Sequence, residues 1–325
     1  MDSLRLVRMR SGILMVGLLC AASFSVGKEQ PPQAPPARMA PPPLAQAVTP
    51  APLAPMTPQE HERGVLMQAI FGEYYRPATR DALVGMPLRR NNVDTSGRFF
   101  IDAVSHSLLA NGDTVLVANG VEMGKGGVRL DGVASPGFLN VFILRQEDGK
   151  WSVLKRHENI AKLGSFGSFG EVQWVTLGAG KPGMAVLTDG AWDGYFMHWL
   201  ALFDPADEVM HKLGGMRVAS GGQDDCAHEP VHPCWIVRGK WRFAPPTRQA
   251  AYDDLVFEFS GMHVRQRKPR NPALRKGVPD PIITPLKASA RYAFDGKRYQ
   301  LVEGKNPVPG LGRRLKRPDG QVLTM

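Results

Sequence analysis

The motif with the most evident chemistry is His228-Glu229-Pro230-Val231-His232. Two histidines four residues apart on an α-helix can bind one zinc ion while the glutamate beside the first activates a water. Pro230 lies inside the motif and Pro233 follows it, and each proline removes a backbone donor and clashes with the preceding helical turn. We therefore predict no zinc-protease site and no metal. Capture of a metal by His228 and His232 in a loop is the alternative.

Two cysteines flank this motif. The chain holds three cysteines, and Cys226 and Cys234 are the two that lie outside the N-terminal leader. In an exported protein, two close cysteines usually form a disulfide. We predict a Cys226–Cys234 bond that closes a small loop and contributes about 2 kcal/mol on the loop-entropy model. Free or metal-bound thiols are the alternative.

Other catalytic signatures are absent from the sequence. There is no Gly-x-Ser-x-Gly nucleophile elbow and no phosphate-binding loop. The acidic pairs Asp224-Asp225 and Asp253-Asp254 consist of adjacent residues, which point to opposite faces of a strand and make no acid/base couple. His198 lies in an apolar run, so we expect a core histidine rather than a ligand. We predict no catalytic residue and no cofactor.

Positive charge is concentrated near the C-terminus. The whole chain carries a formal net charge of +10, and residues 263–325 hold 15 Lys and Arg against 4 Asp and Glu. Such a segment is usually a solvated loop, but as a binding surface it favours anions. Because we expect export, we expect an envelope protein or an anionic envelope polymer as partner and no nucleic acid. The candidate anion-binding residues are Arg265, Arg267, Lys268, Arg270, Arg275 and Lys276.

The first residues have the pattern of an export signal. A positive region with three arginines precedes a short apolar core at residues 13–22, and Ser25-Val26-Gly27 supplies small residues for cleavage. The apolar core is much shorter than the ~20 residues of a spanning helix. We predict that residues 1–27 are a signal peptide and that the mature protein is periplasmic or secreted, without a membrane span. Anchoring in the inner membrane by an uncleaved signal is the alternative.

Residues 28–58 form the next segment and contain eleven prolines mixed with alanine and glutamine. This composition does not bury a core and populates extended polyproline II. We therefore predict a disordered, Pro/Ala-rich linker over residues 28–58. A β-rich globular domain with a basic C-terminal segment follows over residues 59–325.

One helix is predicted where the linker ends. Thr57 suits the N-cap, Pro58 suits the first helical position, and Glu60 can return the capping-box bond. Gly72 is expected to end the helix. The predicted apolar face consists of Val65, Leu66, Ala69 and Ile70.

Short strands are predicted for the rest of the domain. After Asp94, apolar segments are broken by Gly, Asn and Asp about every ten residues, and residues 99–104, 114–118 and 127–130 are candidate strands. Asp148-Gly149 stands between two apolar runs and predicts a type I′ hairpin, because both central residues of that turn need positive φ. We predict a mainly β fold, propeller-like or sandwich-like, with one N-terminal helix.

The hairpin pattern recurs along the chain. Residues 292–299 read Tyr-x-Phe-Asp-Gly-x-x-Tyr, and residues 257–261 form a looser copy that ends in Ser-Gly. Together with the aromatic-rich β units and the cysteine pair before Trp235, this pattern resembles a group of uncharacterised exported bacterial proteins and, more distantly, the FG-GAP/VCBS-type β-propellers. The resemblance covers residues 97–303. It implies a fold class and no activity, since the calcium-loop aspartates of those propellers are largely missing here.

Two function classes remain. The first is a non-enzymatic exported envelope protein, a binding, inhibitor or immunity-type module for a protein or an anionic envelope polymer. The alternative is an envelope or extracellular hydrolase whose active site is assembled from distant strands. The lack of a nucleophile or metal signature favours the first class. A flat aromatic and basic face would support it, whereas a pocket of converging Asp, Glu and His side chains would support the hydrolase.

Overall fold

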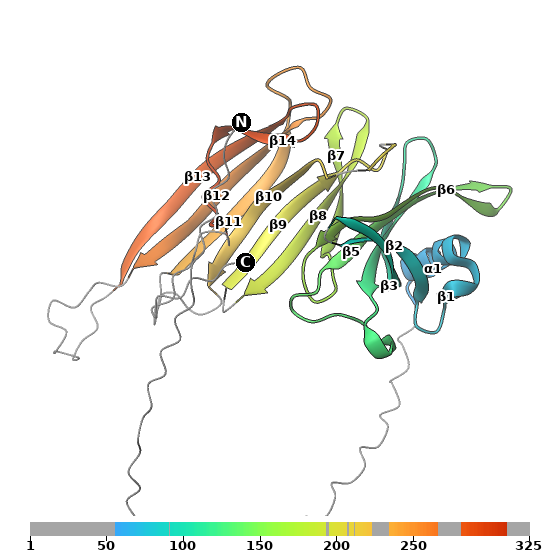
Figure 1. Ribbon diagram of the computed structural model, residues 1–325. Helices are drawn as coiled ribbons and strands as arrows, with labels where there is room; N and C mark the ends of the chain where they lie inside the picture. Colours follow the sequence, from blue (N-terminus) through green and yellow to red (C-terminus); the bar gives the residue numbers. More distant parts are fainter. Residues whose placement is uncertain are drawn as a thin grey trace, which may run out of the picture. The chain divides into compact units, whose positions relative to one another are not determined.

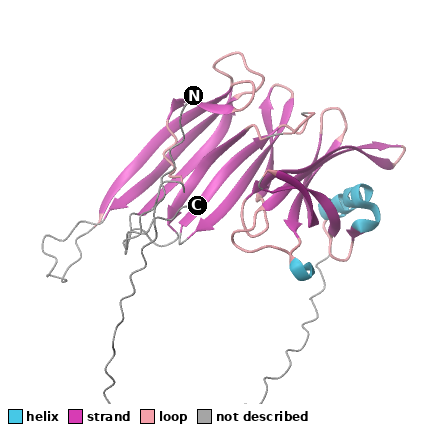
Figure 2. Cartoon of the chain, in the orientation of Figure 1, coloured by secondary structure: helices cyan, strands magenta, loops and turns pink. Residues whose placement is uncertain are grey.

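The fold is built almost entirely of antiparallel strands (Figures 1 and 2). The computed structural model describes residues 56–90, 92–192, 195–206, 208–210, 212–222, 234–265 and 281–310. Within these ranges one α-helix precedes fourteen strands along the chain. The prediction of a mainly β fold with one N-terminal helix is confirmed.

Helix α1 (Pro58–Phe71) begins and ends where the sequence predicts. The Thr57 hydroxyl oxygen accepts a 3.2 Å hydrogen bond from the Glu60 N–H, and the Glu60 carboxylate accepts a 2.7 Å bond from the Thr57 N–H. This reciprocal pair is a capping box, which satisfies two backbone donors that the helix leaves open. Gly72, with φ of +54°, follows the last helical residue. Among the described residues, no helix has the length and apolar character that crossing a bilayer requires.

The buried face of α1 is rotated relative to the predicted one. Val65 is 42% exposed, so its predicted place in the apolar face is wrong. The ring of Phe71 takes part in the core instead and packs edge-on against Phe142, with 5.4 Å between ring centroids. An aromatic ring removes more apolar surface from water than a valine does, which favours this rotation. The buried residues of the helix are Leu66, Met67, Ile70 and Phe71.

Six strands form the first sheet, and each pairs antiparallel with its neighbours in sequence. Figure 1 shows α1 beside this sheet, and the two share one buried apolar cluster. The strands are β1 (Tyr75–Arg76), β2 (Asp81–Arg90), β3 (Val93–Leu108), β4 (Thr114–Glu122), β5 (Gly137–Glu147) and β6 (Lys150–Leu163), and the 3-10 turn η1 (Gly72–Tyr74) links α1 to β1.

The Asp148-Gly149 turn joins β5 to β6 as predicted. The two residues have φ of +51° and +73°, the left-handed values that a type I′ turn requires. The turn sets the pairing of Glu147 with Lys150 at the hairpin end. Trp151, the next residue of β6, packs against the buried apolar cluster that α1 shares with the first sheet.

The segment after β4 is a loop, so the strand predicted at residues 127–130 is wrong. Gly126 and Gly127 have φ of +77° and +79° and turn the chain through the short η2 (Lys125–Gly127). Arg129 then returns to the sheet, where its guanidinium lies 2.6 Å from carboxylate oxygens of both Asp81 and Asp102. These ion pairs hold the loop against β2 and β3.

Eight strands form the second sheet, again in sequence order and antiparallel. They are β7 (Glu171–Gly178), β8 (Lys181–Trp192), β9 (Tyr195–Phe203), β10 (Gly214–Gly222), β11 (Cys234–Ala244), β12 (Asp254–Arg265), β13 (Ile282–Phe294) and β14 (Tyr299–Gly304). The Asp-Gly pair of the recurring hairpin pattern, Asp295-Gly296, lies between β13 and β14 as expected of a hairpin.

The looser hairpin copy at residues 257–261 is not a turn, because those residues lie inside β12. Gly261 is required there by a close approach of two strands. A Cβ on Gly261 would lie 2.0 Å from the carbonyl oxygen of Ile236 on β11. Glycine therefore marks backbone contact at this position rather than a reversal of the chain.

Two further cores complete the fold. One is formed by the second sheet, where Phe257 stacks on Phe259 with 5.4 Å between ring centroids. The other combines residues of both sheets, with Val115 and Val141 from the first and Met184 and Phe203 from the second. The two sheets therefore share buried apolar surface.

Candidate functional site

Strand β11 carries three basic side chains on one face. Its residues alternate, as a strand with one buried face requires. Trp241 packs against the core of the second sheet. Arg238, Lys240 and Arg242 point to the opposite face and are all exposed. The local sequence thus builds a row of cations at every second residue.

The register with β12 and β13 extends this row sideways. Arg238 lies opposite Ser260, which in turn lies opposite Lys287 of β13. Lys287 is exposed as well. Glu258 lies opposite Lys240 and is the acidic neighbour of the group. Throughout, the name basic face refers to Arg238, Lys240, Arg242 and Lys287.

The side chains of the basic face have no ion-pair partner among the described residues. Arg291, also on β13, differs: it lies 2.9 Å from the fully buried carboxylate of Asp254 and 3.7 Å from that of Glu303. The charge of Arg291 is therefore balanced inside the fold. The basic face has four cations and Glu258 as an acidic neighbour, so an excess of positive charge remains there. Such an excess of exposed cations produces a potential that attracts anions.

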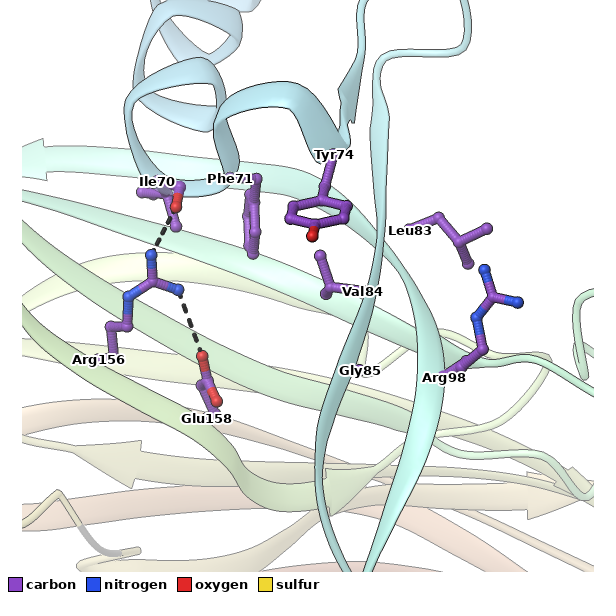
Figure 3. Close-up of a pocket in the computed structure, with 9 residues that line it drawn as sticks. All are labelled: Ile70, Phe71, Tyr74, Leu83, Val84, Gly85, Arg98, Arg156 and Glu158. Carbon is purple, nitrogen blue, oxygen red and sulfur yellow. Dashed lines mark hydrogen bonds and ion pairs between the residues drawn. The ribbon is translucent and has the colours of Figure 1, made fainter.

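A second feature is a pocket of about 490 Å³ at the C-terminal end of α1 (Figure 3). Arg156 of β6 donates a hydrogen bond to the carbonyl oxygen of Ile70 and lies 3.5 Å from the carboxylate of Glu158. Arg98 of β3 has no ion-pair partner among the described residues. Pockets of this volume hold small ligands or a short piece of chain. The lining residues are Ile70, Phe71, Tyr74, Leu83, Val84, Gly85, Arg98, Arg156 and Glu158.

Similarity to known proteins does not assign a function to these features. No protein-family model, curated protein or solved structure matches the chain. The geometry of the basic face and of the pocket therefore carries the functional argument.

Most of the residues singled out by sequence lie outside the described ranges: Cys226, His228, His232, Arg267, Lys268, Arg270, Arg275 and Lys276. Cys234 is described and begins β11. Arg265 is exposed and ends β12, the strand next to the basic face. The described ranges contain no group of three or more His, Cys, Asp or Glu side chains that could hold a metal ion.

His198 is not the core residue that its apolar neighbours predict. Its side chain is 40% exposed, and its Nδ1 pairs with the carboxylate of Asp189, which lies directly opposite on β8. His198 shares its strand with Leu200, which is buried. We interpret the pair as a cross-strand contact.

The sequence contained a signal for the basic face. Arg238, Lys240 and Arg242 alternate with Gly239 and Trp241 in the period-two pattern of a half-buried strand. The anion-binding residues predicted from the sequence follow the density of charge, which is higher downstream, and not its periodicity. No comparable signal marks the pocket, whose arginines come from separate strands.

Proposed function

We propose that this protein is a non-enzymatic binding module that holds an anionic polymer against its basic face. The observation that carries the proposal is the row of Arg238, Lys240 and Arg242, exposed on one face of one strand and without ion-pair partners among the described residues. Cations that stabilise a fold are paired with carboxylates, as Arg291 is with Asp254. Unpaired cations in a row stabilise the fold little and are available to an external anion.

A polymer fits this geometry better than a single ion does. Alternate residues of a strand are about 6.6 Å apart, and strands separated by one neighbour are about 9.6 Å apart. A lone phosphate or carboxylate is bound tightly when several donors converge on it. The basic face instead presents its cations in a line along β11, with Lys287 to the side. A chain with repeated negative charges can contact these cations one after another.

We further propose that the polymer belongs to a cell envelope. The basis is the signal-like pattern of residues 1–27 and the cysteine pair. Cys234 begins the strand of the basic face, and its disulfide with Cys226 remains part of this proposal. The resemblance to FG-GAP/VCBS-type propellers stays a prediction about the fold and adds no ligand.

Binding of inorganic polyphosphate to the full chain tests this proposal, with polyglutamate as a carboxylate counterpart. The variant Arg238→Gln/Lys240→Gln/Arg242→Gln should bind at least about tenfold more weakly, because a polyelectrolyte then loses three contacts. Binding of the unmodified chain should weaken as salt is added. Comparing polyphosphate with polyglutamate tells which anionic group is preferred.

A matched variant controls for net charge. Lys125→Gln/Lys150→Gln/Lys297→Gln removes the same charge from exposed positions that do not belong to the basic face. This variant should bind like the unmodified chain. Equal losses in the two triple variants would mean general charge attraction and would overturn the proposal. Absence of binding to either polymer would overturn it too.

A further inference from the structure

Strand β2 has an edge without a strand partner. On one side it pairs with β3 along its whole length. On the other side β1 pairs only with Asp81 and Ala82, and no described strand pairs with β2 beyond them. An unpaired edge offers backbone N–H and C=O groups to an incoming chain.

The backbone of Gly85 faces this open edge. Gly85 lies opposite Arg98 of β3. The carbonyl oxygen of Arg98 accepts a 2.8 Å hydrogen bond from the N–H of Met123, on the β4 side of β3. Since N–H and C=O of one strand residue point the same way, Gly85 and Arg98 do not bond each other. The N–H and C=O of Gly85 therefore point away from β3.

Strand β6 forms the other side of this opening. Asn159 of β6 donates a 2.6 Å hydrogen bond to the carbonyl oxygen of Pro87, and Lys162 donates a 3.3 Å bond to that of Arg89. These side chains join β6 to the far end of β2. Nearer α1, Arg156 of β6 donates its hydrogen bond to Ile70 instead of to β2. The pocket is lined there by residues of both β2 and β6.

The pocket has two chemically different sides, as Figure 3 shows. Phe71 and Val84 lie on one side of the β2 ribbon, while Leu83 and Arg98 lie on the other. Side chains of a strand added to this edge would alternate between the same two sides. One side offers an aromatic and aliphatic surface. The other offers the guanidinium of Arg98, which has no ion-pair partner among the described residues.

We propose that this pocket binds an extended segment of a partner protein, which adds to the β2 edge as a strand. Backbone groups of the segment bond Gly85, an apolar side chain packs against Phe71 and Val84, and a carboxylate meets Arg98. Main-chain bonds of this kind give affinity, and alternate side-chain pockets give specificity. The contact is short because Pro87, two residues along the same edge, has no N–H to donate. The site is separate from the basic face.

Selection from a library of roughly ten-residue random peptides on the immobilised full chain tests the proposal. Enriched peptides should alternate apolar and acidic residues, and each is then synthesised for solution binding. The variant Gly85→Pro removes the N–H that faces the edge and should weaken binding at least about tenfold. The matched variant Gly85→Ala keeps that N–H, and its Cβ meets no atom within 4 Å, so it should weaken binding much less than Gly85→Pro does.

The charged contact is tested in the same assay. Arg98→Gln should weaken binding of the acidic peptides and reduce its dependence on salt. Arg238→Gln, on the basic face, should leave peptide binding unchanged. If Arg238→Gln weakens peptide binding and Arg98→Gln does not, the peptides bind the basic face and the pocket proposal is wrong.

N-methylation of the peptide tests strand addition without altering the protein. Methylating the backbone amides of an enriched peptide one at a time should weaken binding strongly at alternate positions. Equal tolerance of methyl groups at every position would overturn strand addition. A failure to enrich any peptide would also overturn the proposal. So would a dimer of the chain that Gly85→Pro converts to monomer, because the edge would then bind a second copy of the chain.

Discussion

The side chain of Asn119 on β4 holds the backbone of Phe169 in the connection between the two sheets. Its Oδ1 accepts a 3.2 Å hydrogen bond from the Phe169 N–H, and its Nδ2 donates a 2.7 Å bond to the carbonyl oxygen of Gly167. Asn119 is buried, and Phe169 is fully buried in the core that the sheets share. One amide therefore fixes the chain where it passes from one sheet to the other.

Replacing this amide should destabilise the fold. Asn119→Leu keeps the approximate volume but leaves the N–H of Phe169 and the carbonyl of Gly167 without their partner. Unsatisfied buried groups of this kind cost about 1–3 kcal/mol each, so we expect a loss of about 2–4 kcal/mol in the free energy of unfolding by urea titration. Gln146→Leu, at an exposed position of β5, is the control and should change little. A loss in Asn119→Leu no larger than in the control would contradict this role.

Asp81 should be the most sensitive carboxylate of the first sheet. Burial alone would raise the pKa of Asp81, but hydrogen bonds from Thr79, Arg76 and Arg129 outweigh it and hold the pKa below its ordinary value of 3.8. Asp81→Asn removes the negative charge that Arg76 and Arg129 contact. We expect this to lower the free energy of unfolding by about 3 kcal/mol. Thermal unfolding measures this loss, and Asp94→Asn, at a side chain that is 92% exposed, serves as control.

The same carboxylate predicts sensitivity to acid. Because the folded-state pKa of Asp81 lies below 3.8, its stabilisation is fully present above that pH and is lost as the pH falls through the folded value. The difference in stability between the unmodified chain and Asp81→Asn should therefore shrink below about pH 4. A difference that stays constant down to about pH 2 would show that Asp81 does not contribute through its charge.

His157 predicts a pH effect in a higher window. Burial lowers the pKa of His157 below 6.5, and the nearby Lys155 lowers it further. As the pH falls, His157 therefore binds a proton in the unfolded chain at a higher pH than in the folded chain. Stability then falls as the pH drops from about 6.5 toward the folded pKa. His157→Gln should lack this part of the decline, as urea unfolding between about pH 5 and 8 would reveal. Identical pH profiles of the two proteins would refute the assignment.

The predicted disulfide can be tested by mass analysis of the native protein after thiol alkylation. We expect no alkylation at Cys226 or Cys234 before reduction. Replacing both by Ser should lower stability by about 1–3 kcal/mol while polyphosphate binding of the folded fraction survives. Cys226 lies outside the described residues, so this experiment decides the pairing. Stoichiometric zinc that is lost in His228→Ala would indicate a metal loop instead.

Local patterns predicted the elements well. The Thr57–Glu60 capping box and the Asp148-Gly149 turn both lie where the sequence placed them. Two of the errors occurred where packing between distant segments decides the outcome. Val65 is exposed because Phe71 takes the core contact, and Gly261 lies inside a strand because β11 approaches its backbone closely.

The candidate sites divide in the same way. The basic row of β11 is readable from the sequence, because alternation along one strand involves neighbouring residues and a period of two. The sequence does not show that Gly85 lies opposite Arg98 or that the edge of β2 is open. Register and the direction of backbone groups depend on pairing with other strands. The sequence by itself determined caps, turns and alternating faces through contacts between near neighbours. Only the tertiary structure decided which faces and edges stay open, since that depends on partners as distant as Asn119 and Phe169, fifty residues apart.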